Sequence, residues 1–284
     1  MKTCLSPVLL VVLALGFATE ARAQLVVSDS FSGYTAGSMS GQGTGLGTGW
    51  TTSSWYNVSG SATAVPTSGL TYSGVTSQNG LVQIGSPGAA QRSFSAVSSG
   101  TLYVGALVQF PDANSGFRLI GFGGNNTSGN NGNVMMGQIH QNAGTTDIWL
   151  ELRRGSDGNV TAGPSEDTGL VPVANQTTYL VARIDFNTSG SLDSVYMWVN
   201  PTSATQLQNA ATASVSSINE TDIGNIANFW AYSGSGGGIS FDEIRVSTLA
   251  TDMTAIPEPS TYAALFGLAV LGVAACRRRQ RQTV

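Results

Sequence analysis

Short segments of this chain alternate apolar residues with other residues, and this alternation limits the fold more than any other feature. In residues 101–110, TLYVGALVQF, the apolar positions on one face are Leu102, Val104, Ala106, Val108 and Phe110. The same spacing recurs in residues 147–153, 179–186 and 195–199. Successive side chains of a β-strand point to opposite faces, so a repeat of two predicts strands.

These strands are expected to form one domain. Gly-rich stretches such as residues 121–132 and 234–238 separate the apolar runs, and about 11 to 13 segments fit the strand pattern. The 36 glycines raise disorder as an alternative, but 41% of the residues are hydrophobic, which is enough to fill a core. We therefore predict an all-β fold, a two-sheet antiparallel jelly-roll sandwich over residues 24–250.

Charge and residue usage exclude several classes of function. Residues 24–259 hold 15 acidic residues, six arginines and no lysine, which gives a net charge of −9. A nucleic-acid binder needs cationic side chains to neutralise phosphates, so no nucleic-acid partner is expected. His140 is the only histidine, and Cys4 and Cys276 lie in apolar terminal segments. A zinc site built from Cys and His in the domain is therefore excluded.

The N-terminus has the three parts of a secretory signal peptide. Lys2 precedes an apolar run over residues 5–17, and Ala21-Arg22-Ala23 supplies the small–x–small pattern of a cleavage site. We predict cleavage between Ala23 and Gln24, so that residues 1–23 are removed on export. A buried or uncleaved N-terminal helix is the alternative.

A second hydrophobic segment lies near the C-terminus. Residues 260–276 carry no charge and would form a transmembrane helix roughly 26 Å long, close to the hydrocarbon thickness of about 30 Å. Four arginines follow at once, namely Arg277, Arg278, Arg279 and Arg281. Arginines that flank a span stay on the cytoplasmic side. This topology predicts that the domain lies outside the cytoplasm and that residues 277–284 form a cytoplasmic tail.

Pro257-Glu258-Pro259 precedes the apolar segment, and the three parts together resemble the PEP-CTERM sorting signal of Gram-negative bacteria. The resemblance covers residues 256–281. It implies that exosortase, a membrane-embedded cysteine transpeptidase-like protease, cleaves an inner-membrane precursor near the tripeptide. It also implies transfer to the cell surface or extracellular matrix, often among exopolysaccharide. The prolines keep the tripeptide extended in a linker expected at residues 251–259; a plain C-terminal anchor is the alternative.

Two further stretches resemble the ends of a concanavalin A-like or laminin-G-like sandwich domain. They are residues 28–50, which open with Ser-Asp-Ser-Phe, and residues 238–247, GISFDEIRVS. The resemblance implies that the first and last strands run side by side. Calcium sites occur in this fold family, and Asp29 and Asp242 are the candidate ligands. A solvated acidic pair at a sheet edge is the alternative, and no other cofactor is predicted.

The last of these strands changes its apolar phase. Ile239 and Phe241 share one phase, whereas Ile244 and Val246 share the other. An extra residue in a strand produces such a change, so a β-bulge or twist is predicted at Asp242-Glu243.

Asp147 and Glu151 come nearest to a glycosidase acid pair. They lie four residues apart on one strand face, which separates them by roughly 13 Å, whereas a retaining pair needs about 5–5.5 Å. The position that would supply the first acid of an E-x-D-x-x-E motif is Thr146. We therefore predict no catalytic residue and no enzymatic activity, and a glycoside hydrolase is the least favoured hypothesis.

Trp149, Tyr196 and Trp198 occupy the strand phase opposite the aliphatic residues. Exposed on a sheet, these rings would stack on sugars; covered by loops, they are ordinary core. The leading hypothesis is an exported, non-enzymatic surface or extracellular-matrix protein processed by exosortase. The alternative is a carbohydrate-binding module on the same sandwich.

Overall fold

The computed structural model describes residues 25–254 with the exception of residues 45, 74, 77–78, 113–115, 125–133, 139–146, 155–160, 188–191, 222 and 235–236. The predicted signal peptide, transmembrane helix and cytoplasmic tail lie outside the described residues. The helices found in the described ranges are all too short, and too polar, to serve as a membrane span.

The described residues form strands almost throughout. The strands of the main sheet are β1 Leu25–Asp29, β2 Gly37–Ser38, β3 Tyr56–Val65, β6 Leu81–Val97, β7 Gly100–Gln109, β8 Arg118–Gly123, β9 Val134–Gln138, β10 Trp149–Arg154, β11 Thr161–Asp167, β12 Thr177–Phe186, β13 Asp193–Val199, β14 Val215–Thr221, β15 Ile226–Ser233 and β16 Ile239–Ser247. The other elements are the strand pair β4 Thr71–Tyr72 and β5 Val75–Thr76, the helices α2 Ala204–Gln208 and α3 Thr251–Thr254, and the 3-10 helix η1 Ala210–Thr212.

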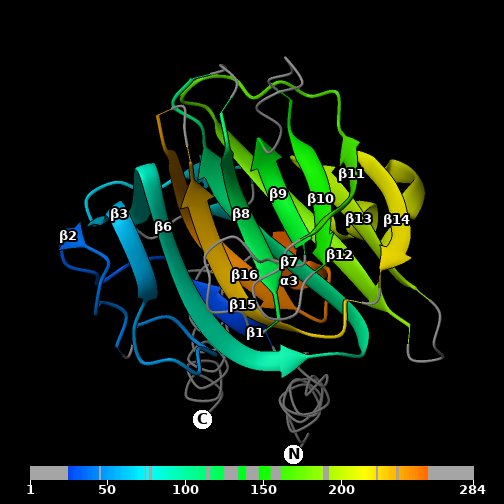
Figure 1. The fold of residues 1–284 in the computed structure, drawn as a ribbon, viewed down its shortest axis with the longest axis horizontal. Coiled ribbons are helices and arrows are strands. Elements are labelled where there is room, and N and C mark those ends of the chain that lie inside the picture. The colour runs from blue at the N-terminus through cyan, green and yellow to red at the C-terminus, as the bar shows by residue number, and fades with distance from the viewer. Residues whose placement is uncertain are drawn as a thin grey trace, which may run out of the picture.

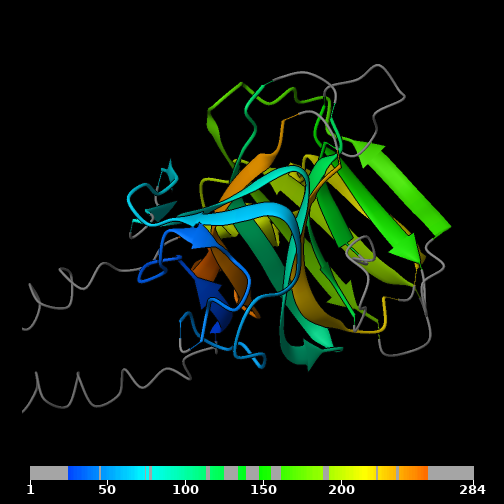
Figure 2. The same cartoon turned by 60° about the vertical axis from the view of Figure 1, so that its left-hand side comes forward.

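The strands pack as two antiparallel layers (Figure 1). One layer has the order β3-β6-β15-β8-β9-β10-β11, and the other has the order β1-β16-β7-β12-β13-β14. The long strand β6 belongs to both, because residues 82–84 pair with β16 and residues 88–97 pair with β15. The predicted all-β sandwich is confirmed, with the difference that β6 joins its two sheets into one curled sheet (Figure 2).

The main core lies between the layers and is filled by alternate residues of strands such as β7, β10, β12 and β13. The predicted face of residues 101–110 is buried there, as are the matching positions of β10, β12 and β13. Those inward side chains include Val104, Val108, Leu150, Leu180 and Met197. Burying alternate apolar side chains of both sheets is what holds such a sandwich together.

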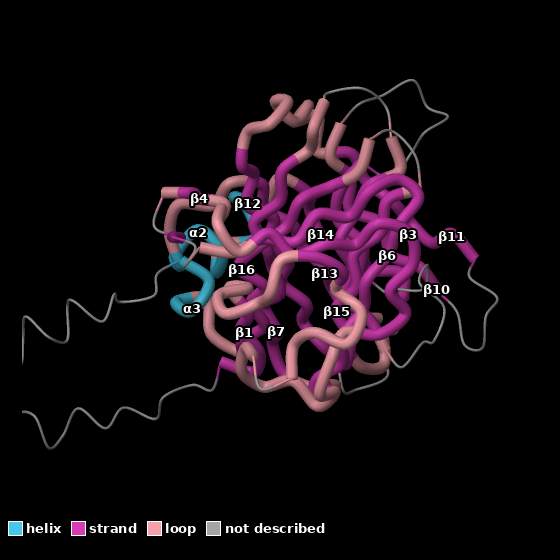
Figure 3. The backbone as a smooth tube through the Cα atoms, turned by 90° about the vertical axis from the view of Figure 1, so that its left-hand side faces the viewer, coloured by secondary structure: helices cyan, strands magenta, loops and turns pink. Residues whose placement is uncertain are grey.

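The outer face of the β7–β12–β13 layer is also covered. The helices α2 and α3 and strand β4 gather on one side of the molecule (Figure 3), and Leu207 and Met253 from the helices pack in one cluster with Tyr179 and Trp198. Trp198 is fully buried and Tyr196 is half-buried against the same cluster. Trp198 is therefore ordinary core, which was one of the two interpretations of the opposite-phase rings.

The predicted bulge in β16 is confirmed. The register of β16 against β7 shifts between Asp242 and Arg245, and Glu243 has a φ of 49°. The additional residue turns the strand over, so that Phe241 before the bulge and Ile244 after it both face the main core.

The first and last strands lie side by side, as expected. β1 pairs antiparallel with β16, with Leu25 opposite Ser247 and Asp29 opposite Ile244. The first and last strands of the described chain thus lie side by side, and residues 251–254, assigned from the sequence to a linker, form α3 on the outer face of the β7–β12–β13 layer.

Candidate functional site

The residues predicted to direct export and sorting lie outside the described part of the chain. These are Ala23 and Gln24 at the expected cleavage site, Pro257, Glu258 and Pro259 of the tripeptide, and Arg277, Arg278, Arg279 and Arg281. His140 lies outside it as well. The structure does show how the body ends just before the tripeptide.

The helix α3 is fixed firmly to the body. The side chain of Met253 is fully buried, and the Tyr179 hydroxyl donates to the Met253 carbonyl at 2.6 Å. Arg245 Nη1 donates to the Asp252 carbonyl at 3.2 Å, and the Ser247 hydroxyl donates to Asp252 Oδ2 at 2.5 Å. Burial raises the pKa of Tyr179, so its hydroxyl stays a donor. In sequence, Pro257 follows this anchored helix by three residues.

Asp29 sits in a closed polar network at the end of β1. Its Oδ2 accepts from Arg92 Nη1 at 2.9 Å and from the Tyr34 hydroxyl at 2.7 Å, while Oδ1 accepts from the Phe31 amide at 3.0 Å. Burial raises the pKa of Asp29, and the Tyr34, Phe31 and Arg92 donors oppose that rise. Because the carboxylate is enclosed by protein donors, its role here is to fasten the N-terminal segment.

Asp242 has a different set of partners on the outer face of β16. Its Oδ2 accepts from the Leu70 amide at 2.9 Å, and its Oδ1 accepts from the Glu243 amide at 2.7 Å. Asp29 and Asp242 are 2% and 0% exposed, so the interpretation of a solvated acidic pair is wrong. Among the described residues, no three acidic, His or Cys side chains are grouped to hold a metal.

Asp147 and Glu151 both follow the outward phase of β10. Glu151 is buried between Met135 on β9 and Ser165 on β11, with which it is in register. Burial raises the pKa of Asp147, and a hydrogen bond and the charge of Asp167 raise it further. The nearest acidic partner of Asp147 is thus on β11 rather than along its own strand.

The outward face around these acids carries a small aromatic cluster. Trp230 on β15 is buried with Leu119 and Met135, and Trp149 and Tyr232 pack against them half-buried. The Trp230 ring lies over Gly121, where an added Cβ would come within 2.3 Å of it. Trp230 is therefore packed flat on the sheet, whereas Trp149, one of the opposite-phase rings, stays half-buried.

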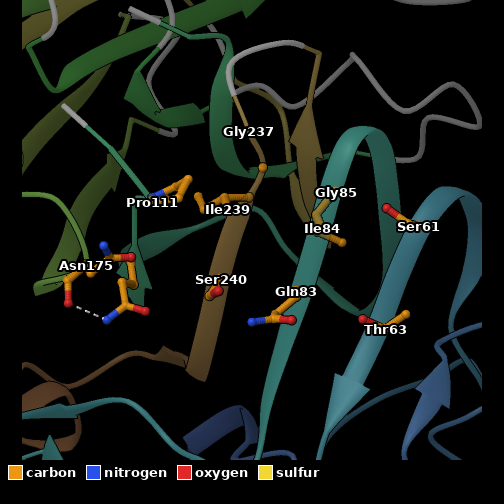
Figure 4. A pocket seen from close by; sticks show the side chains of 12 residues that line it. Ser61, Thr63, Gln83, Ile84, Gly85, Pro111, Asn175, Gly237, Ile239 and Ser240 are labelled. Atoms are coloured by element: carbon orange, nitrogen blue, oxygen red, sulfur yellow. Dashed lines mark hydrogen bonds between the residues drawn. The ribbon is translucent and has the colours of Figure 1, made fainter. Parts of the chain in front are cut away.

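A groove of about 290 Å³ opens on the outer face of β3, β6, β16 and β7 (Figure 4). Its polar side chains come from four neighbouring strands and from the segment before β12; they are Ser61, Thr63, Gln83, Ser240, Gln109 and Asn175. Gly85, Gly237 and Gly238 leave its floor without side chains. Sequence analysis missed this site because its residues form no motif and meet only through strand pairing.

Several solved structures are similar to this chain. An alginate lyase from Aplysia kurodai has a TM-score of 0.47 at 15% identity, covering 79% of this chain and 99% of that one. An endo-1,3-beta-glucanase from Streptomyces sioyaensis has a TM-score of 0.41 at 14% identity, with 79% and 95% covered. Domain 4 of a GH43 arabinanase from Geobacillus stearothermophilus, in complex with arabinotriose, has a TM-score of 0.42 at 16% identity, with 82% and 98% covered. Similarity of this degree assigns no function to the chain.

No curated protein matches the chain in sequence. Residues 255–279, in contrast, match the family described as the PEP-CTERM protein-sorting motif. The matched range contains the tripeptide, the apolar segment and the first three of the four arginines. It starts at the residue that follows α3. The chain thus carries a PEP-CTERM sorting motif directly behind an antiparallel β-sandwich.

Proposed function

We propose that this chain is an exported, non-enzymatic surface or extracellular-matrix protein that exosortase processes at its C-terminal signal. The observation that carries the proposal is the sorting motif at residues 255–279, which begins where the anchored helix α3 ends. The membrane enzyme would then meet the tripeptide at a fixed distance from a folded body.

The arginines that follow the apolar segment support a precursor that is first held in the membrane and then cleaved. The apolar segment would hold the precursor in the membrane, and the four arginines after it would keep the tail on the cytoplasmic side. The tripeptide follows α3, whose Met253 carbonyl is held by the Tyr179 hydroxyl. The precursor would therefore carry its folded body close to the membrane until exosortase cleaves it.

The use of the buried acids supports a role other than catalysis. Asp29 and Asp242 accept hydrogen bonds from arginine, tyrosine and backbone donors, which leaves them structural. Asp147 precedes β10 by two residues and Glu151 lies on it; four extended residues separate them by roughly 13 Å, more than either glycosidase geometry of about 5–9.5 Å allows.

Replacement of the tripeptide tests the sorting step. A variant with Pro257→Ala, Glu258→Ala and Pro259→Ala should accumulate as a full-length, membrane-bound form, detected by fractionation and immunoblot. A control with Thr67→Ala and Ser68→Ala, in a turn of the body, should be processed like the wild type. Equal processing of the tripeptide variant would refute the proposal.

A further inference from the structure

We propose that the groove on the outer face of β3, β6, β16 and β7 binds a segment of a neutral, unbranched hexose polysaccharide. This inference rests on the proposed function, since it gives the surface protein a partner outside the cell. The groove is a different surface from the one that carries the aromatic cluster of β15 and β10.

Strand pairing lines up the polar side chains of the groove. Thr63 is in register with Gln83, Gln83 with Ser240, and Ser240 with Gln109. Neighbouring strands are about 4.8 Å apart, so the four side chains form a straight row about 14 Å long. A row of this length suits an extended chain of a few sugar units better than a compact ligand.

The row offers uncharged hydrogen-bonding groups. Its hydroxyls and side-chain amides each donate and accept, and Figure 4 shows one side-chain hydrogen bond among the lining residues, from Gln109 Nε2 to the Asn175 carbonyl at 2.6 Å. Thr63, Gln83 and Ser240 have no such bond with the other residues drawn. Their exposed or half-buried side chains can therefore turn toward the hydroxyls of a ligand.

Among the residues that the structure describes, none of those lining the groove is charged. Asp112 lies next to the lining residue Gly237, and it is paired with the buried Arg118, whose Nη2 donates to Asp112 Oδ1 at 2.9 Å. A charged ligand would lose hydration without gaining a counter-charge, and the body as a whole is acidic. The groove therefore favours neutral sugars over uronic acids.

The floor of the groove depends on glycine. Gly238 has a φ of +95°, and a Cβ at this position would lie 2.3 Å from the Ile84 carbonyl oxygen. Glycine at this position therefore lets β16 pass close to the backbone of β6, which shapes the groove floor.

The groove lies away from the start of the described chain. Ser240 and Ser247 are near opposite ends of β16, seven residues apart, which corresponds to roughly 20 Å along the strand. Ser247 pairs with Leu25, the first described residue.

Isothermal titration of the full chain in mild detergent tests the proposal. The probes are cellohexaose, laminarihexaose, maltohexaose and mannohexaose, with an alginate hexamer as the charged counterpart. At least one neutral hexamer should bind, and the alginate hexamer should bind at least tenfold more weakly. Failure of all four neutral probes, or equal binding of alginate, would overturn the proposal.

Groove variants locate the binding surface. Combining Thr63→Val, Gln83→Ala and Ser240→Ala removes three hydrogen-bonding groups and should weaken binding at least tenfold. The isosteric single variant Gln83→Glu should weaken it as well, while the exposed control pair Thr71→Val and Gln208→Ala should leave it unchanged. Circular dichroism identifies any variant that misfolds. If the triple variant misfolds, glycan binding by the Gln83→Glu variant decides whether the groove is the binding site.

If binding persists in the folded groove variants, the groove is not the site. Processing of the wild type and of the tripeptide variant, followed by membrane fractionation, is a separate readout. Absence of glycan binding by a wild-type chain that is processed normally would overturn the groove proposal alone. Normal processing of the tripeptide variant together with intact glycan binding would refute the sorting proposal alone.

Discussion

Arg92 Nη1 lies 2.9 Å from Asp29 Oδ2, and the two side chains are only 2% and 1% exposed. The pair links β6 to the end of β1, while Arg92 Nη2 donates to the Gly43 carbonyl and the guanidinium lies 4.7 Å from the centre of the Trp50 ring. One arginine thus fastens most of the segment between β1 and β3 to the sandwich.

Removal of this arginine should destabilise the fold strongly. Arg92→Met leaves Asp29 buried without its cation, which costs about 3–5 kcal/mol in comparable buried pairs. The control Arg183→Met breaks a partly exposed pair with Asp185 and should cost about 1 kcal/mol or less. Urea unfolding of the full chain in detergent measures the free energy of unfolding of both variants. Equal losses of stability in Arg92→Met and Arg183→Met would contradict the role of Arg92 as a buried anchor.

Asp242 should control the segment that covers the outer face of β16. In Asp242→Ala the buried amides of Leu70 and Glu243 lose their acceptor, at a cost of about 1–3 kcal/mol each. Limited proteolysis should therefore cleave between residues 66 and 73 at least tenfold faster. Tyr72→Phe, which loses a hydroxyl bond to the Asn200 carbonyl at an exposed position, should have a smaller effect. Unchanged cleavage in Asp242→Ala would show that other contacts hold this segment.

Asp147 should make stability depend on pH. Burial and then the Asp167 carboxyl raise its pKa in the folded state, so its contribution is complete below the unfolded pKa of about 3.9 and is lost as pH rises through the folded pKa. Asp147→Asn should therefore raise the Tm at pH 7 and leave it unchanged near pH 3. Asp167→Asn removes the other charge and should act in the same direction. A lower Tm of Asp147→Asn at pH 7 would contradict this interpretation.

Glu151 is expected to have no catalytic role. The full chain should release no reducing sugar from laminarin or barley β-glucan, and Glu151→Gln should not differ from it, because the strand spacing places Glu151 too far from Asp147 for paired-carboxyl chemistry. A glucanase of known activity serves as the positive control. Hydrolysis by the wild type that disappears in Glu151→Gln would show that the chain is an enzyme.

The sequence predicted best those features that depend only on which face of a strand each side chain occupies. The alternation in residues 101–110 and the phase change at Asp242-Glu243 depend only on the geometry of a strand, and both predictions are confirmed. The pairing of the first and last strands was implied by a family resemblance and is confirmed as well.

Features that depend on which strands become neighbours could not be predicted. Asp29 and Arg92 are 63 residues apart, and nothing local indicates that burial would bring them together. The row of Thr63, Gln83, Ser240 and Gln109 likewise exists only through the order of four strands. Trp198 was ambiguous because its burial depends on α2 and α3 covering the sheet.

The intact mass of the mature protein tests the central claim most directly. If a signal peptidase and exosortase process the chain, the mass should correspond to a polypeptide that starts at Gln24 and ends near Pro257-Glu258-Pro259, outside the cytoplasm. A mature polypeptide recovered from the cytosol with residues 1–23 and 260–284 still attached would contradict the account.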